Sequence, residues 1–314
     1  MTAAGRIPVI LDCDPGHDDA LAITLALARP ELEVLGITTV GGNAPLAATT
    51  RNALRVLALL GRPDVPVAAG APAPLVRDLE TAPEVHGTSG LDGADLPEPV
   101  SEPREEGALE FLRATLEAAP APVTLIPTGP LTNIALLLRT YPGLAARIAR
   151  ISLMGGSMRA GNWTPAAEFN IWVDPEAARI VFRSGLPITM CGLDVTHRAL
   201  MGLPEVDRLR ALGTRTGSVF ADLLLFFTRF HVERYGSADT PIHDAVAVAA
   251  VALPDLVTTH RYHVDVAVDS DITRGRTVVD DRGQPGEPPN VDVALDIDRA
   301  AFADLVIDAV AAFR

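Results

Sequence analysis

Four aspartates fall within one short stretch near the N-terminus of the chain. The string DCDPGHDD places carboxylates at Asp12, Asp14, Asp18 and Asp19, between an apolar strand-like run and an Ala/Leu-rich helical run. Like charges this close repel one another strongly, and a hard divalent cation with oxygen ligands would relieve the repulsion. Helix capping alone requires neither Asp14 nor the Pro-Gly bend that follows it. The pattern therefore predicts a metal site.

A competing interpretation of the Asp-x-Asp pair is the nucleophile loop of aspartyl-phosphate phosphatases, in which an aspartate attacks phosphate covalently. The chain contains no lysine to support that chemistry, and Pro15 and Gly16 follow the second aspartate at once. We therefore favour the metal interpretation.

Further polar groups follow other predicted strands. Asn43 ends the string GGN, Thr128 opens TGPLTN, and Asp244 lies in PIHDA at the start of a helical run. In open α/β sheets such positions meet at the carboxyl ends of the strands, where ligands bind. The carbonyl of Thr128 and the carboxylate of Asp244 are expected to complete a calcium sphere that Asp14 and Asp19 begin.

Short β-rich runs alternate with helical segments, which is the pattern of a parallel sheet with helical crossovers. We predict strands at 7–13, 32–40, 65–69, 123–127, 151–154 and 186–190, and helices at 18–29, 46–60, 131–141, 174–184, 219–235, 244–252 and 300–313. The stretches 71–106 and 160–170 are predicted to be loops, and loops of such length are more often functional than idle. Residues 260–297 are predicted to form a β-rich appendage with a turn at 282–289.

No repeat or low-complexity linker divides the chain. We therefore expect residues 1–314 to form a single α/β domain, with a mostly parallel central sheet and helices on both faces in an open, Rossmann-like arrangement.

The chain is acidic, with 40 acidic and 26 basic residues and a formal net charge of −14. This balance argues against nucleic acid and anionic membranes as partners, and it suits a small neutral substrate or a site that collects a cation. Two cysteines exclude a disulfide scaffold. The sequence shows neither a secretion signal nor the ~18 to 20 apolar residues of a membrane span. We expect a soluble, cytoplasmic protein.

Several blocks together resemble the inosine–uridine-preferring nucleoside hydrolase family. They are DCDPGHDDALAI, GGN, HGTSGLDG, PTGPLTN, LMGG, NWTPAAEFN and PIHDAVAV, and they occur in this order from residue 9 to about residue 251. The resemblance implies the fold of that family and calcium-dependent hydrolysis of the N-glycosidic bond of ribonucleosides to base and ribose. It also implies a role in purine or pyrimidine salvage and assembly as a homodimer or homotetramer.

Carried over residue by residue, the resemblance implies that Asp14, Asp19, Asp244 and the carbonyl of Thr128 hold one Ca²⁺. Asp14 would also act as general base on a water held by the metal. The substrate-binding residues are expected to be Asp18 and Asn43 near the ribose 2′-hydroxyl, Asn162, Glu168 and Asn170 at the other hydroxyls, Met154 under the sugar, and His86, Phe169 and Tyr235 near the base.

The chemistry is consistent with these assignments. A ribose cis-diol is a good bidentate ligand for calcium, and carboxylates stabilise the oxocarbenium-like transition state. The departing base needs an acid, for which His243 is our candidate because it precedes Asp244. A capping or core histidine is the alternative. His17 is expected to be structural, Trp163 and Phe169 either stack on the ligand or pack, and Tyr235 either closes over the base or ends a solvated helix.

Three functional classes remain open: a ribonucleoside hydrolase, an N-ribosyl hydrolase of a modified nucleoside, and a catalytically silent calcium-binding module. The presence of Asp14, Asn162, Glu168, Asn170 and His243 together argues against the third class. Histidines at both 86 and 243 favour pyrimidine-preferring or nonspecific members of the family.

Overall fold

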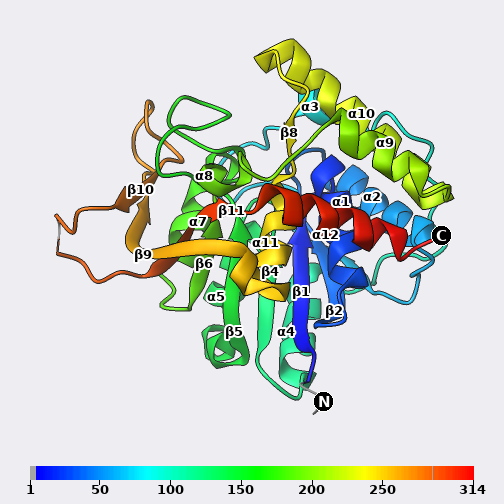
Figure 1. Cartoon of the computed structure of the whole chain (residues 1–314). Helices are drawn as coiled ribbons and strands as arrows, with labels where there is room; N and C mark the ends of the chain where they lie inside the picture. The colour runs from blue at the N-terminus through cyan, green and yellow to red at the C-terminus, as the bar shows by residue number, and fades with distance from the viewer. Residues whose placement is uncertain (1–4, 285) are drawn as a thin grey trace.

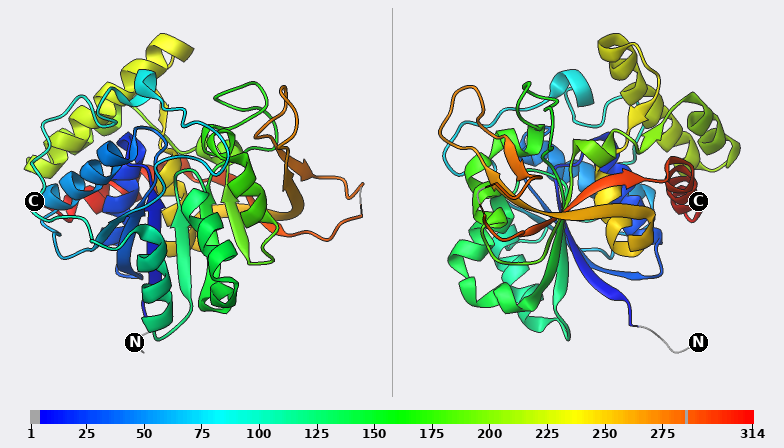
Figure 2. Two further views of the ribbon diagram at one scale, coloured as in Figure 1. Left: turned by 180° about the vertical axis from the view of Figure 1, so that it is seen from behind. Right: turned by 60° about the vertical axis from the view of Figure 1, so that its left-hand side comes forward.

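The computed structural model describes residues 5–284 and 286–314, without the side chain of Tyr235. Within these residues, nine strands form one twisted sheet covered by helices on both faces (Figure 1 and Figure 2). In spatial order the strands are β10 (Thr277–Asp280), β9 (Val257–Val266), β11 (Val291–Ile297), β6 (Ile188–Cys191), β5 (Ile148–Met154), β4 (Val123–Pro127), β1 (Ile7–Cys13), β2 (Leu32–Thr39) and β3 (Val67–Ala69).

The seven strands from β11 to β3 run parallel to one another, whereas β9 is antiparallel to both β11 and β10. Parallel strands are covered on both faces and therefore read as continuous apolar runs. β1 illustrates this, because the residues from Val9 onward are all buried. A second sheet pairs β7 (Leu200–Met201) with β8 (Thr240–Pro241) in antiparallel fashion.

The helices form two groups, each with its own apolar cluster against the sheet (Figure 2, right). One group comprises α1 (His17–Ala28), α2 (Leu46–Leu59), α9 (Leu203–Ala211), α10 (Arg215–Tyr235), α11 (His243–Ala252) and α12 (Arg299–Ala311). The other comprises α4 (Ala108–Ala118), α5 (Thr132–Thr140) and α7 (Pro175–Phe182). Three short helices, α3 (Pro83–His86), α6 (Phe169–Val173) and α8 (Leu193–Thr196), lie in connections, as do the 3₁₀ turns at Pro142–Arg147 and Pro254–Leu256.

The packing of α1 against α11 positions the aspartates that the sequence singled out. α11 has the sequence HDAVAVAAVA, and from Asp244 onward all its residues are buried, because small side chains allow neighbouring elements to approach on every side. Both helices begin near the carboxyl ends of the parallel strands (Figure 1). Their first turns therefore face each other at that edge of the sheet.

The predicted strands and helices are present, with ends that shift by up to a few residues. The helices α4 and α9 and the short helices α3, α6 and α8 were not predicted, and α10 begins at Arg215 rather than at residue 219. Within the described residues, no helix is both long enough and apolar enough to span a membrane.

The prediction that residues 260–297 form an appendage is wrong. β11 lies inside the main sheet, where it pairs with β6 on one side and β9 on the other. Val291, Val293 and Ala294 are completely buried, so the segment contributes to the core. Pro285, in the turn predicted at 282–289, lies outside the described residues.

Candidate active site

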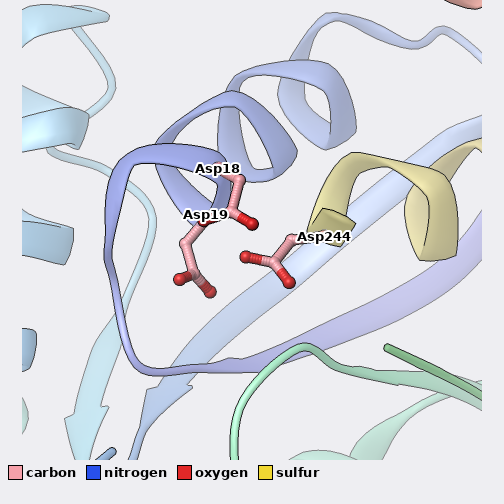
Figure 3. A group of neighbouring side chains, drawn as sticks. All are labelled: Asp18, Asp19 and Asp244. Atoms are coloured by element: carbon pink, nitrogen blue, oxygen red, sulfur yellow. The ribbon is translucent and has the colours of Figure 1, made fainter. Parts of the chain in front are cut away.

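Three carboxylates converge at the carboxyl edge of the sheet. Asp18 and Asp19 lie in the first turn of α1, and Asp244 lies in the first turn of α11 (Figure 3). One carboxylate oxygen from each lies within 4.8 Å of the others, and all three side chains are buried. The positive ends of the two helix dipoles favour negative charge here, but they cannot neutralise three carboxylates. The cluster can therefore bind a metal ion, and its oxygen donors suit a hard cation.

Asp14, at the end of β1, is completely buried beside this cluster. Its Oδ2 atom accepts a 2.6 Å hydrogen bond from the backbone N–H of Asn43. Its Oδ1 atom is also buried, yet it accepts no hydrogen bond from the described residues. A buried carboxylate oxygen normally has a donor or a cation against it, so this atom fits a metal ligand.

Two glycines bring the backbone close to the Asp14 carboxylate. A Cβ atom at Gly42 would lie 2.1 Å from Asp14 Oδ2, and one at Gly129 would lie 2.5 Å from Asp14 Oδ1. No side chain fits at such distances. The glycines of GGN and TGPLTN are therefore required by the close approach of their loops to this carboxylate.

Asp19 is fixed by three donors. The Thr128 hydroxyl donates to Oδ1 at 2.8 Å, while the Gly16 N–H at 2.9 Å and the Asn43 side-chain amide at 3.4 Å donate to Oδ2. The carbonyl of Thr128 accepts a 2.7 Å hydrogen bond from the side-chain amide of Asn170. A carbonyl oxygen has a second lone pair, so Thr128 can still offer a ligand atom.

Burial and mutual repulsion disturb the ionisation of these carboxylates. Burial, followed by the charge of Asp19, raises the pKa of Asp14 well above its usual range and that of Asp18 to about 7. Burial, with the charges of the neighbouring aspartates, also raises the pKa of Asp244 well above its usual range. Functional sites often keep carboxylates close together despite the energetic cost of burial and repulsion. A bound divalent cation would restore the ionised forms of these carboxylates.

A cavity of about 720 Å³ opens beside the cluster. The predicted residues that line it are Asp18, Asn43, His86, Thr128, Met154, Asn162, Trp163, Glu168, Phe169, Asn170, His243 and Asp244. Asp14 and Asp19 are buried behind this lining rather than part of it. The side chain of Tyr235 lies outside the described part of the chain.

The predicted sugar-binding residues are held in place by the loop that leads into α6. Glu168 caps that helix, with Oε1 accepting the N–H of Asn170 at 2.9 Å and Oε2 accepting the N–H of Gly156 at 3.0 Å. Burial raises the pKa of Glu168 to about 7. The Asn162 side-chain oxygen accepts the N–H of Phe169 at 3.0 Å. These polar groups are positioned before any ligand arrives.

Phe169 has a packing role as well as a place in the lining. It lies in a small apolar cluster with Ala82 and Val173. The ring of Trp163 meets it edge-on at a centroid distance of 4.9 Å. Both alternatives that the sequence left open for Phe169, packing and ligand contact, are therefore compatible with its position.

Another wall of the cavity is rich in histidine and phenylalanine rings. His86 stacks on His17 at 5.3 Å and on Phe227 at 5.4 Å. His17 is 2% exposed, and its Nε2 lies 2.9 Å from the carbonyl oxygen of Asp92. His17 thus lies behind His86 and outside the cavity lining, as expected for a structural residue.

His243 lines the cavity next to the carboxylates. Its Nδ1 atom lies 2.8 Å from the hydroxyl oxygen of Thr196, which fixes the ring. Burial, together with the His197 and His231 rings, lowers the pKa of His243 well below its usual range. The ring is therefore neutral before substrate binds, and a neutral imidazole still carries one N–H that can donate.

Several residues that line the cavity were not predicted as site residues: His197, Phe227, Phe230, Arg234 and Asp239. Four-residue spacing along α10 places Phe227 beside His231, and Phe230 beside Arg234. The four-residue spacing indicates that these residues share one face of the helix, but it does not reveal which face lines a cavity.

A buried carboxylate cluster and a deep cavity at the carboxyl edge of a mostly parallel sheet define an α/β enzyme that acts on a small polar molecule. The family model for inosine-uridine preferring nucleoside hydrolases matches residues 9–304, and the chain belongs to that family. It is a ribonucleoside hydrolase.

Similar proteins include a pyrimidine-specific ribonucleoside hydrolase, RihA, from Salmonella agona. The two are 51% identical over 303 residues, which cover 96% of this chain and 97% of that protein. Among solved structures, a purine-preferring ribonucleoside hydrolase from Gardnerella vaginalis is 35% identical, with a TM-score of 0.91 over 97% of this chain and 98% of the other. A plant nucleoside hydrolase is 33% identical, with a TM-score of 0.91 over 98% of this chain and 99% of the other.

Proposed function

We propose that this chain catalyses calcium-dependent hydrolysis of the N-glycosidic bond of pyrimidine ribonucleosides, which releases the base and ribose. The observation that carries the proposal is the cavity in which buried aspartates adjoin polar groups held ready for a sugar. The pyrimidine preference is supported by the 51% identity to a relative described as pyrimidine-specific.

Calcium is proposed because all the donors are oxygens. Asp14, Asp19, Asp244 and the carbonyl of Thr128 would hold it, and the buried Oδ1 atom of Asp14, which accepts no hydrogen bond from the described residues, supports this set. Asp18 belongs to the same group of carboxylates and also lines the cavity, so we assign it to the ribose 2′-hydroxyl next to the ion. When bound, calcium would lower the pKa of a water molecule and accept the vicinal ribose hydroxyls as ligands.

Asp14 is proposed to be the general base. Its Oδ2 atom is occupied by the N–H of Asn43, so Oδ1 is the atom that would receive a proton from the attacking water. The remaining carboxylates would stabilise the positive charge that develops on the ribose as the bond to the base breaks. Asn170, with Glu168 and Asn162, would hold the other sugar hydroxyls.

The histidine- and phenylalanine-rich wall is proposed to receive the base. His243 would donate its remaining N–H to the departing base, with the ring held by the Thr196 hydroxyl. His86 would contact the base from the neighbouring loop, and Tyr235 is the other candidate donor. We also expect a cytoplasmic homodimer or homotetramer that has no nucleic acid or membrane partner.

A substrate panel tests the proposal. With Ca²⁺ present, uridine and cytidine should release free ribose with a higher kcat/KM than inosine or adenosine. A preference for inosine would refute pyrimidine specificity and leave the hydrolase activity intact. Release of ribose from a base-modified nucleoside alone would favour the N-ribosyl hydrolase alternative. Calcium binding without any release of ribose would favour the silent binding module.

A further inference from the structure

One carboxylate outside the cavity joins three separate segments of the chain. Glu80 lies in the long connection between β3 and α4. Its Oε2 atom accepts the indole N–H of Trp163 at 3.2 Å and that of Trp172 at 3.1 Å. Its Oε1 atom accepts a 3.3 Å hydrogen bond from Arg274. Charge-assisted hydrogen bonds of this kind are stronger than neutral ones.

The partners of Glu80 also support one another. The guanidinium carbon of Arg274 lies 3.4 Å from the centre of the Trp172 ring, which is a close cation–π contact. The Arg274 side chain is only 18% exposed, so its charge depends on the Glu80 carboxylate and the Trp172 ring for compensation. The chain contains two tryptophans, and both donate to Glu80.

Glu80 and its two tryptophan partners lie close to residues that line the cavity. Two residues after Glu80, Ala82 packs with Trp163 and Phe169 in one apolar cluster, and α3 then places His86 in the lining. On the other side, Trp163 and the preceding Asn162 both line the cavity, and Trp172 lies in α6. Glu80 therefore connects the wall that carries His86 to the wall that carries the proposed sugar-binding residues.

We propose that Glu80 is a positioning residue, which holds these two walls at the separation that binds substrate. Glu80 does not line the cavity, so it acts through Trp163 and α3 rather than by touching the ligand. Without Glu80, substrate binding would have to order the loops that lead into α3 and α6. The entropic cost of this ordering would weaken binding of the ground state and of the transition state equally. The effect should therefore appear in KM and spare kcat. This role rests on the proposed function.

The test compares Glu80→Ala with Glu98→Ala, using uridine as substrate. Glu98 lies in the same connection and pairs with Arg51, but it is exposed and lies well past the end of α3 in the chain. For Glu80→Ala, loss of the three charge-assisted hydrogen bonds at a half-exposed carboxylate should raise KM about tenfold, with kcat within about twofold of wild type. Glu98→Ala should leave both constants unchanged. Glu80→Gln keeps an oxygen that accepts indole N–H groups, so its KM should lie between the values for Glu80→Ala and wild type.

Tryptophan fluorescence provides a second readout that needs no activity. In Glu80→Ala the indoles lose their shared acceptor, so their emission should shift to longer wavelength and acrylamide should quench it more strongly than in wild type or Glu98→Ala. A wild-type KM in Glu80→Ala, or an equal rise in Glu98→Ala, would overturn the positioning role. If the wild-type chain cleaves no nucleoside, the proposed function fails, and unchanged quenching in Glu80→Ala would then overturn the Glu80 contact itself.

Discussion

The backbone N–H of Asn43 donates a 2.6 Å hydrogen bond to Oδ2 of Asp14 and thereby fixes the orientation of that carboxylate. The other oxygen, Oδ1, is buried without a hydrogen-bond donor among the residues that the structure describes. One carboxylate thus has one oxygen committed to the protein and one available for a cation and a proton. This division of roles underlies the first prediction.

Replacing Asp14 with Ala should reduce kcat for uridine by several powers of ten. The loss should exceed the ~10² to 10⁴ that a general base alone contributes, because a proposed metal ligand is removed as well. Steady-state kinetics at saturating Ca²⁺ measures this, and thermal unfolding confirms that the variant is folded. A kcat near the wild-type value would rule out the proposed mechanism.

Calcium should stabilise the folded protein, because the ligand set exists only when α1 and α11 are packed together. At a free Ca²⁺ concentration of about 100 times Kd, the expected gain in unfolding free energy is about 2.7 kcal/mol. The increase in Tm should reverse with a chelator and should disappear in Asp244→Asn. Asp296→Asn, at an exposed aspartate paired with Arg198, is the matched control and should keep the increase. A Tm that does not respond to Ca²⁺ would contradict the metal assignment.

Uridine and 2′-deoxyuridine should differ strongly as substrates. The 2′-hydroxyl is proposed to contact the ion, Asp18 and Asn43, and its loss leaves buried polar groups unpaired. Sites built to bind a hydroxyl reject analogues without it by as much as ~10⁴ to 10⁵. We expect kcat/KM for 2′-deoxyuridine to be lower by at least about two powers of ten. Equal values would remove the support for this arrangement of the sugar.

The role of His243 can be separated from that of Asp14 by the choice of leaving group. His243→Ala should lower kcat for uridine with little change in KM, because the donated proton matters in the transition state. p-Nitrophenyl riboside needs no proton on departure, so the same variant should cleave it nearly normally, whereas Asp14→Ala should fail on both substrates. Thr196→Val, which removes the hydroxyl next to Nδ1, should have a smaller effect in the same direction. Equal loss of both activities in His243→Ala would make this residue structural, and His86 and Tyr235 would be the next candidates.

The parts of the fold that could be predicted were those with a strong local pattern. β1 and β4 match their predicted bounds because a continuous apolar run ends in a polar turn. α4 was missed although Phe111, Leu112 and Leu116 give it an apolar face, because the predicted loop ended at residue 106 and the segment after it was assigned no element. The position of β11 between β9 and β6 depends on pairing between distant strands, which no local pattern encodes.

The residues of the candidate site could likewise be predicted only where they lie in a local motif. The aspartates and the ribose-side residues lie in compact motifs, so their types and order could be read from the sequence. His197 and Phe227 carry no motif, and they reach the cavity only because α8 and α10 pack beside α3 and α11. The contacts of Glu80 could not be predicted either, since Trp163, Trp172 and Arg274 all lie far from Glu80 in the sequence.

The pairing of α1 with α11 also determines when the site can form during synthesis. Asp19 leaves the ribosome early, whereas Asp244 follows more than two hundred residues later. At ~5 to 20 residues per second, the nascent chain carries the N-terminal aspartates for roughly 10 to 45 seconds before their partner exists. Contacts between such distant positions form late in folding, because the intervening chain must first be ordered. Calcium uptake should therefore mark the end of folding, and a chain that stops before α11 should not retain the ion.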